Sequence, residues 1–323
     1  MSEPTFSFST TAEEVATIFS DEIKGKTALI TGSSIGGIGF EAARVIAKHA
    51  KLVVITGYNE ERLKLSEEAI KKDIPNANIL RLTVNLSSFA SIRKAAAEVN
   101  ALPEPLHVLI HNAAASFGDF KLTEDGVETR LATDHVGPFL FTKLLAPKLL
   151  AAVTPTYTAR VIFISGLGHS FCTGVDFDAL TDPDPEKYVK TTAFFQAESA
   201  RILTAIELSK RSKGKINGYS VNPGLIFTNI YTRADQVSLV QEMGAVLPDG
   251  KPNPEFGQWK TIPQGAATTV AAAFDPRLND KPGAYLEDSA PANDKVAAHS
   301  SDPVTAEKLW AVTEQLIGEK FIF

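Results

Sequence analysis

A cluster of glycines near the N-terminus has the spacing of a phosphate-binding turn. Gly32, Gly36, Gly37 and Gly39 lie in the run TGSSIGGIG, between the apolar run KTALIT and the helical run FEAARVIAKH. Glycine permits a tight turn and the close approach of a phosphate because it has no Cβ. The free N–H groups at the start of the following helix attract negative charge. This arrangement predicts a site for the pyrophosphate of a dinucleotide.

The elements that would position this turn alternate along the chain. Near-continuous apolar runs predict buried parallel strands at Thr27–Thr31, Leu52–Thr56, Asn78–Leu82, Val108–His111, Arg160–Ser165 and Lys215–Val221. Amphipathic runs predict helices near Ile38–His49, Glu60–Lys72, Ser87–Val99, Gly126–Leu150 and Thr191–Arg211. Alternation of this kind predicts an α/β fold with a doubly wound, Rossmann-like parallel sheet in a single domain.

The rest of the chain is expected to flank or cover this sheet. Residues 1–25 are expected as an N-terminal extension and residues 26–323 as the Rossmann-like domain. Polar residues, prolines and glycines at about 225–262 are typical of a lid or substrate loop over a scaffold. A helix at Pro263–Ala273, a short strand at Gly283–Leu286 and a last helix at Pro303–Ile317 are predicted to complete the domain.

Composition narrows the classes of partner. The net charge of -6 gives no basic surface for nucleic acid, and no apolar run is long enough to predict a membrane span. The first residues lack the basic start and apolar core of a signal peptide. The single cysteine, Cys172, suits a reducing compartment. A cytoplasmic protein without a metal site is therefore predicted.

Several motifs resemble the short-chain dehydrogenase/reductase family, in particular its retinol-dehydrogenase-like and fungal members. The glycine run resembles TGxxxGIG with one additional residue. HNAA at His111–Ala114, DHVGPFLFT at Asp134–Thr142 and NPGLIFTN at Asn222–Asn229 resemble the family's NNAG, NHxGHFxLT and PGxxxT motifs. The resemblance covers roughly Ile23 to Leu316, and it implies the Rossmann fold.

The resemblance implies a set of cofactor contacts. They are Gly32, Ser34, Gly36, Gly37, Ile38, Tyr58, Asn112, Pro223, Gly224 and Thr228. Tyr58 follows the second strand, at the place where the sequences of NADP-using relatives resemble the run GRN. This chain therefore has neither an Asp for a ribose hydroxyl nor an Arg for a 2′-phosphate at that place. We expect either that no cofactor is required or that the ancestral site still binds NADP(H).

The resemblance also locates the four positions that carry catalysis in the family, and all four are changed. Phe194 stands at the Tyr position and Glu198 at the Lys position, while Gly166 replaces the Ser and Asp134 the Asn. A phenyl ring has no ionisable proton, and a carboxylate in place of an ammonium raises the pKa of a neighbouring acid. The usual hydride chemistry is therefore expected to be lost.

The changed residues suggest another chemistry. Asp134 and Glu198 bring two carboxylates to the crevice that the family uses, and His169 lies nearby in sequence, so these three are the candidate catalytic residues. Two carboxyl groups in a low-dielectric pocket can acquire different pKa values and act as acid and base. An apolar substrate pocket is expected at Gly166, Phe194 and Phe171.

Simpler interpretations of these residues stay open. Glu198 and Arg201 are spaced three apart and could form an ion pair on a helix surface. His169 has a counterpart in many relatives, which favours a structural or substrate-lining role. Asp134 could serve only to bind a strand end, and aromatic residues at this place are as often part of the core.

Three functions follow from this pattern. The first is a non-redox catalyst of the cyclase or isomerase type, acting on a small, mostly apolar metabolite in fungal secondary metabolism. The second is an NADPH-dependent carbonyl oxidoreductase with residual activity, and the third is a ligand-binding pseudoenzyme. The expected partner is a small molecule, without nucleic acid or membrane, and the resemblance leaves a homodimer open.

Overall fold

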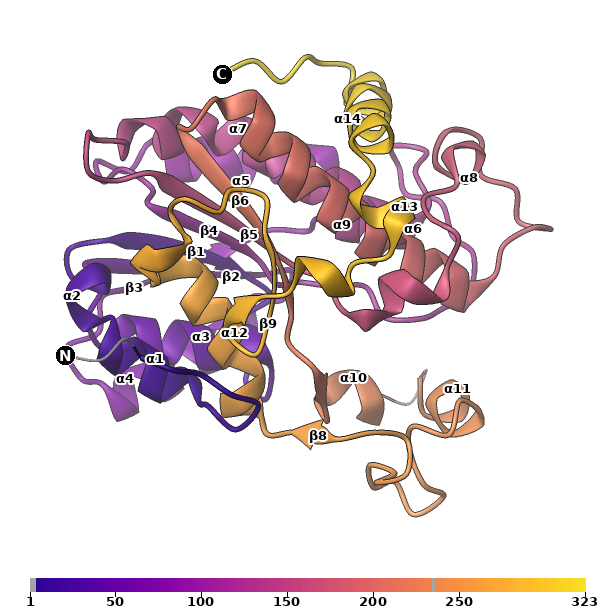
Figure 1. Ribbon diagram of the computed structural model, residues 1–323, viewed down its shortest axis with the longest axis horizontal. Helices are drawn as coiled ribbons and strands as arrows, with labels where there is room; N and C mark the ends of the chain where they lie inside the picture. Colours follow the sequence, from indigo (N-terminus) through magenta and orange to yellow (C-terminus); the bar gives the residue numbers. More distant parts are fainter. Residues whose placement is uncertain (1–3, 234–235) are drawn as a thin grey trace.

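Eight strands form the central sheet in the described part of the chain, residues 4–233 and 236–323 of the computed structural model (Figure 1). Their order is β10-β9-β6-β5-β4-β1-β2-β3, and all neighbours are parallel except β10, which is antiparallel to β9. The strand order reverses beside β1, which confirms the predicted doubly wound Rossmann-like fold. The strands are β1 Thr27–Thr31, β2 Leu52–Gly57, β3 Ile79–Thr83, β4 Val108–His111, β5 Ala159–Ile164, β6 Ile216–Asn222, β9 Tyr285–Glu287 and β10 Ala290–Pro291.

Helices cover both faces of the sheet, which is why its strands are apolar throughout. Every residue of β1, β4 and β5 is buried. One face packs against α1 Ala12–Ile18, α3 Ile38–Ala47, α4 Glu60–Asp73 and α12 Ile262–Phe274. The other packs against α5 Phe89–Asn100, α7 Gly137–Ala151, α9 Lys190–Ser212 and α14 Pro303–Ile317.

The predicted helix at Gly126–Leu150 is interrupted in the structure. Gly126 has a φ of +78°, a left-handed conformation, and helical structure begins only at α6 Thr129–Leu131. A π-helical turn, Ala132–Val136, then joins α6 to α7. Such turns are frequent at functional sites. This one buries Asp134 in the interior of the domain.

The N-terminal segment, expected as an extension before the domain, contributes to the core. Helix α1 packs against α12 and α3, and α2 Ser20–Ile23 leads into β1. Val15 and Ile23 have no exposed surface, whereas Ile18, on the same helix as Val15, is 49% exposed. The capping box formed by Thr11 and Glu14 fixes where α1 begins. Residues 4–25 therefore pack as part of the domain.

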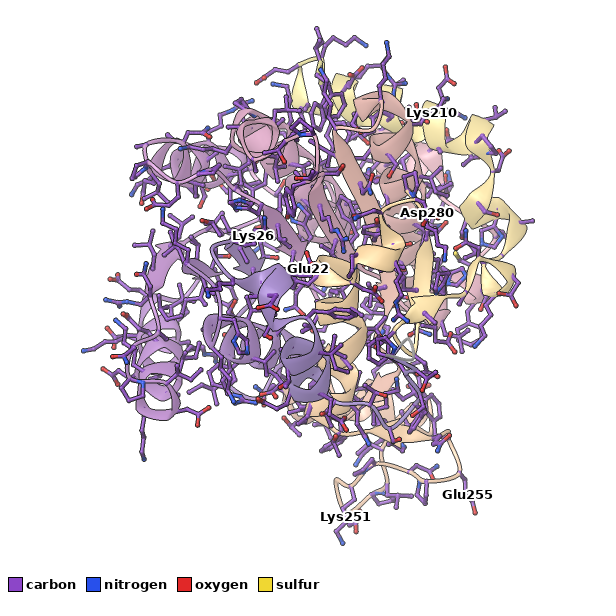
Figure 2. The ribbon with its side chains drawn as sticks, turned by 60° about the vertical axis from the view of Figure 1, so that its left-hand side comes forward. Glu22, Lys26, Lys210, Lys251, Glu255 and Asp280 are labelled. Carbon is purple, nitrogen blue, oxygen red and sulfur yellow. The ribbon has the colours of Figure 1, made fainter. Side chains whose placement is uncertain are left out.

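The segment expected as a lid projects from the sheet beside the carboxyl end of β6. Its root is a two-stranded parallel ribbon of β7 Leu225–Ile226 and β8 Trp259–Lys260. Between them lie two short helices, α10 Asn229–Thr232 and α11 Val237–Glu242, where irregular structure was predicted. We name residues 225–260 the lid segment. Figure 2 shows Lys251 and Glu255 at its far end, away from the sheet.

The root of the lid segment is tied to the last strands of the sheet. Lys260 is buried and forms an ion pair with Asp288, which lies between β9 and β10. Gly224 has a φ of +86° and lies against the Lys260 side chain. The remaining short elements are η2 Leu167–Phe171, α8 Phe177–Thr181, η3 Pro276–Leu278, η4 Asn293–Lys295 and α13 Ala298–Ser301.

Helix α1 supplies a test of this packing. Val15→Asp places a charge without a partner in the core, and we expect it to lower the free energy of unfolding by about 3 kcal/mol or more. Ile18→Asp is the matched control on the exposed side, with an expected change within about 1 kcal/mol. Denaturant unfolding measures both. Equal effects of the two substitutions would contradict the docking of α1.

Candidate active site

The glycine-rich turn has the geometry of a phosphate cradle. Gly32 and Gly36 have φ values of +72° and +81°, which other residues rarely adopt. A Cβ on Gly32 would lie 2.7 Å from the Cα of Ala113, so the turn also needs glycine for close packing. Gly37 is the N-cap of α3 and no side chain caps that end. The first N–H groups of α3, which begins at Ile38, are therefore not used by a capping side chain.

Asn112 holds the turn in place. Its Nδ2 donates to the carbonyl oxygens of Thr31 and Gly32, both at 3.0 Å. The hydroxyl of Thr31 accepts from the backbone N–H groups of Asn112 and Ala113, both at 3.0 Å. The carboxyl end of β4 and the turn after β1 are thus joined by hydrogen bonds. Asn112, predicted as a cofactor contact, has a structural role in the turn.

The other predicted cofactor residues surround the turn unevenly. Thr228 caps α10, and the next residue, Asn229, donates from Nδ2 to the carbonyl of Ile35 at 3.0 Å, so the lid segment contacts the turn. Pro223 and Gly224 connect β6 to the lid segment, and Ser34 is half-buried in the turn. Tyr58, at the end of β2, is 67% exposed. The turn fits a phosphate group, whereas Tyr58 supplies no charge for an adenosine ribose.

Glu198 lies at the centre of the candidate site. It is on α9, and its carboxylate fills the space beside two glycines at the carboxyl end of β5. A Cβ on Gly166 would lie 2.7 Å from Oε1 of Glu198, and a Cβ on Gly168 would lie 2.5 Å from Oε2. The carboxylate therefore occupies the volume that a side chain at residue 166 would need. Because Gly166 has no side chain, the carboxylate of Glu198 can lie directly against its backbone.

Burial dominates the electrostatics of Glu198. The pKa of its carboxyl is raised to about 7, mainly by desolvation and also by the charge of Asp134, while Arg201 and the backbone N–H groups of His169 and Gly168 act in the opposite direction. Oε2 has no hydrogen-bond partner in the described part of the chain. A carboxyl group with this pKa exchanges its proton near neutral pH.

Arg201 is the functional residue that the sequence interpretation missed. Its guanidinium forms an ion pair with Asp134, 3.1 Å from Nη2 to Oδ1, and both side chains are buried. It also donates to the carbonyl oxygens of Asp134 and Ile164, each at 2.8 Å. The interpretation of Glu198 and Arg201 as a surface ion pair is wrong, because both are buried and the ion pair joins Arg201 to Asp134. The sequence placed two carboxylates in the expected crevice and no cation beside them, and this imbalance could have pointed to a nearby arginine.

Asp134 is held by more than one group. Its Oδ1 accepts from the backbone N–H of Ala115 at 2.7 Å in addition to its ion pair with Arg201. Burial raises the pKa of Asp134 to about 6, and Arg201 and the Ala115 N–H oppose that shift. Asp134 and Glu198 are close enough for the charge of one to raise the pKa of the other. The structure thus brings the two predicted carboxylates into one site, with Arg201 as their shared cation.

Both ring nitrogens of His169 bind backbone groups. Nδ1 lies 2.6 Å from the carbonyl oxygen of Gly166 and must donate, since Nε2 accepts from the N–H of Ala297 at 3.2 Å. Burial lowers the pKa of the ring. The Nδ1 proton is therefore used within η2 and its N-cap, and the lone pair of Nε2 holds η2 against the segment before α13. This geometry favours the structural interpretation of His169 over an acid–base role.

An apolar cluster covers one side of the site. Phe194 packs against Phe117, with ring centroids 4.8 Å apart, and against the lid segment. Phe171 is 65% exposed on η2, and its ring meets Phe195 edge to face at 5.5 Å. Leu167, also on η2, is 54% exposed. The predicted pocket residues Phe194 and Phe171 thus lie on the inner and outer parts of an apolar surface.

A membrane span and a metal site each place requirements of their own on the described residues. Among the described residues, no helix is long and apolar enough to cross a membrane. The same residues contain no group of three or more His, Cys, Asp or Glu side chains arranged to hold a metal ion.

Comparison with known proteins places this geometry in a family context. Residues 26–170 match the family model described as short chain dehydrogenase. The chain is 35% identical to Short-chain dehydrogenase TIC 32 A, chloroplastic, of Brassica napus, over 95% of this chain and 92% of that protein. It is 32% identical to Short-chain dehydrogenase/reductase prx1 of Penicillium rubens, over 92% of this chain and 86% of that protein. The first relative is named chloroplastic, and the cytoplasmic location stays a prediction.

Solved structures agree with the fold. A protein of Mycobacterium paratuberculosis superimposes with a TM-score of 0.68 at 22% identity, over 93% of this chain and 96% of its own. A gluconate 5-dehydrogenase of Burkholderia cenocepacia, solved in complex with NADP and tartrate, gives a TM-score of 0.59 at 19% identity, over 83% of this chain and 95% of its own. At these identities the likeness supports the fold alone.

The raised pKa of Glu198 predicts a pH dependence of stability. The folded protein holds this proton up to about pH 7, whereas the unfolded chain releases it near pH 4.5, so ionisation opposes folding across that window. Relative to Glu198→Gln, the wild type should lose about 2–3 kcal/mol of unfolding free energy as pH rises from 4.5 to above 7. Urea unfolding at several pH values measures the difference. Parallel pH profiles would contradict the buried, raised carboxyl group.

The shared volume of Gly166 and Glu198 predicts coupling between them. The φ of Gly166 is 179°, which any residue adopts, so Gly166→Ser should be costly only through contact with Glu198. We expect Gly166→Ser to destabilise the wild type by about 1–3 kcal/mol and to cost about 1 kcal/mol less in a Glu198→Ala background. A double-mutant cycle of unfolding free energies measures the coupling. Additive effects would place the Glu198 carboxylate elsewhere.

Proposed function

We propose that this chain, which belongs to the short-chain dehydrogenase family, catalyses proton transfer on a small apolar carbonyl compound. The reaction would not transfer a hydride. The reaction would be an isomerisation or a cyclisation in secondary metabolism. The buried carboxyl group of Glu198, with its pKa of about 7, is the observation that carries the proposal. A general acid or base works best when its pKa is near the operating pH.

The four altered positions argue against hydride chemistry. On the family's pattern, Phe194 stands where the tyrosine acid would be and Glu198 where the lysine would be. Phe194 cannot protonate an alkoxide. The Glu198 carboxylate occupies the space beside Gly166 in which a serine hydroxyl would polarise the carbonyl. Each of these changes removes a group that stabilises negative charge on the substrate oxygen in a reduction.

The same residues suit enolisation. The carboxylate of Glu198 would take a proton from the carbon next to the substrate carbonyl, and the electron pair of that C–H bond would pass to the carbonyl oxygen. In an isomerisation, the Glu198 carboxylic acid would then return the proton to another carbon of the enolate. In a cyclisation, the enolate carbon would instead bond to a second carbonyl carbon of the same molecule, the π electrons of that carbonyl would pass to its oxygen, and this oxygen would take the proton from Glu198. Neither route needs an oxidant or a reductant. Arg201, paired with Asp134, places a positive charge near the developing anion.

The apolar surroundings indicate the class of substrate. Phe194 and Phe117 pack on the inner side of the site, and Phe195, Phe171 and Leu167 lie at its outer side. Such a surface favours a hydrocarbon ring or chain that carries one or two carbonyl groups. The low dielectric it creates also maintains the raised pKa of Glu198.

A nicotinamide dinucleotide fits only one end of the site. When bound, such a cofactor supplies or accepts a hydride. Gly32, Gly36 and the N-terminus of α3 would hold its phosphates. At the position of the family's lysine, however, Glu198 presents a carboxylate that cannot lower the pKa of a neighbouring acid. No step of the proposed reaction passes through the dinucleotide.

A second candidate is an NADPH-dependent carbonyl reductase with residual activity. The glycine turn, with its two left-handed glycines and uncapped helix, is the observation that favours it. The curated relatives are also named as dehydrogenases or reductases.

One experiment separates the two candidates. A panel of apolar cyclic ketones and enones is incubated with the protein in D2O, and exchange of the protons next to the carbonyl is followed by NMR without nucleotide. Glu198→Gln should lower the exchange rate about 100-fold or more, because a positioned general base contributes 10²- to 10⁴-fold. Glu186→Gln, an exposed change twelve residues earlier, is the control and should leave the rate unchanged.

The opposite results are equally specific. Absence of exchange together with loss of NADPH absorbance on the same ketones would support the reductase. Absence of both, with ketone binding retained, would favour the ligand-binding pseudoenzyme. Exchange that persists at the wild-type rate in Glu198→Gln would overturn Glu198 as the base.

A further inference from the structure

We propose that Tyr231, on helix α10 of the lid segment, donates a hydrogen bond to the substrate oxygen and so supplies the phenol that residue 194 lacks. This inference rests on the proposed proton-transfer function and assigns a second catalytic residue to it. Tyr231 lies 37 residues after Phe194, in a segment that the sequence pattern predicted only as a loop.

The lid segment brings Tyr231 into the same apolar cluster as Phe194. Phe117, Val240 and Val246 form the buried centre of this cluster. Phe194 and Tyr231 both pack against that centre, together with Phe227, Leu239 and Met243. The cluster therefore joins α9, α10, α11 and the loop after β4 around one side of the candidate site. Tyr231 and Phe194 thus pack against the same buried residues.

Aromatic neighbours fix the ring of Tyr231. Its ring stacks on Phe227, with centroids 5.8 Å apart and planes 21° apart. Trp259, on the root strand β8, meets the ring edge to face at 5.4 Å. Contacts on a face and an edge limit the freedom of the side chain and lower the entropy lost when its hydroxyl binds a ligand.

The hydroxyl of Tyr231 is available and lies in the electric field of Glu198. It makes no hydrogen bond within residues 4–233 and 236–323. Burial raises the pKa of Tyr231, and the charge of Glu198 raises it further. The phenol consequently keeps its proton at neutral pH. It can donate a hydrogen bond while Glu198 acts as the base.

The two other tyrosines near the site are held outside the lid segment, although the buried hydroxyl of Tyr285 also has no hydrogen-bond partner among the described residues. Tyr188 donates to the carbonyl of Gly118 and to Glu128, both at 3.3 Å, and so belongs to the loop after β4. Tyr285 is 1% exposed on β9, where its ring meets His169 edge to face at 5.4 Å. Tyr231 is the one of these three that the lid segment carries.

The chemistry divides between two groups. As Glu198 takes the carbon-bound proton, negative charge grows on the substrate oxygen, and the Tyr231 O–H would stabilise it by a hydrogen bond. The proton stays on the phenol throughout, and Glu198 returns the proton it took. Hydrogen-bond donors aimed at a developing oxyanion are worth about 10²- to 10³-fold in rate.

The first test compares Tyr231→Phe with the wild type in the deuterium-exchange assay. The ring contacts remain, so we expect kcat to fall about 10²- to 10³-fold with little change in KM. Tyr157→Phe is the control, because Tyr157 lies at the far end of β5 and donates to the carbonyl of His107. An unchanged kcat in Tyr231→Phe would overturn the proposal.

A second measurement reports on Tyr231 without any substrate. Protein labelled with ¹³C at the hydroxyl-bearing carbon of tyrosine is titrated by NMR, and the resonance missing from Tyr231→Phe is assigned to Tyr231. Glu198→Gln removes a nearby negative charge, so the titration midpoint of Tyr231 should fall. An unchanged midpoint would overturn the proposal.

The two measurements together separate the inference from the function it rests on. Absence of exchange in the wild type with a midpoint that responds to Glu198→Gln would reject the proton-transfer function and the catalytic role of Tyr231, and it would leave the geometry standing. Exchange in the wild type with an unresponsive midpoint would reject Tyr231 alone.

Discussion

The buried guanidinium of Arg201 joins the parts of the chain that form the candidate site. It binds the carbonyl oxygen at the end of β5, the backbone of the π-helical turn and the carboxylate of Asp134. A buried cation is very costly unless an anion and hydrogen-bond acceptors surround it. Asp134 supplies the anion, and its carboxylate also accepts a hydrogen bond from the backbone N–H of Ala115, which extends the network to the loop after β4. Burial, aided by the charge of Asp134 and opposed by Arg201, raises the pKa of Glu198 to about 7, so Glu198 keeps its proton to about neutral pH.

The position of the Glu198 carboxylate depends on the small size of its two glycine neighbours. The carboxylate of Glu198 reaches toward β5 and occupies the space beside Gly166 and Gly168. A side chain at either glycine would collide with it, so the carboxylate and the two glycines form one packing unit. The proposed chemistry therefore depends on the absence of two side chains as much as on the presence of one acid.

The sheet and the glycine turn could be predicted from the sequence, because continuous apolar runs and a glycine cluster are local signals. The ends of the strands needed only small corrections. Three features depend on contacts between distant segments and left no such signal. Residues 4–25 have ordinary composition, yet α1 packs on α12. Arg201 is one of many arginines in the sequence until its burial is known. The π-helical turn leads into Gly137, where α7 lies so close to the loop after β3 that a Cβ would meet the carbonyl oxygen of Leu86.

Some candidate residues could likewise be found from the sequence, whereas the roles of others depend on contacts between distant segments. Asp134 and Glu198 were found because the resemblance located their positions, and the structure brings them to one cation. The same resemblance could not reveal that both nitrogens of His169 are used by backbone groups, since those groups come from η2 and from the segment before α13. No sequence pattern singled out Tyr231, because it joins the cluster around Phe117 only through the fold of the lid segment.

The parallel ribbon at the root of the lid segment has a consequence for how such a protein can diversify. Its two strands leave and rejoin the domain side by side, and Lys260 with Asp288 fastens the point of return. A loop whose ends are fixed close together can gain or lose residues at its tip for a small entropic cost, since that cost grows only with the logarithm of loop length. The region around Lys251 and Glu255 can therefore vary in length and composition while the sheet and the buried carboxyl group of Glu198 stay unchanged. Only the tip of the lid segment has this freedom, because Tyr231 near its root packs in the cluster around Phe117.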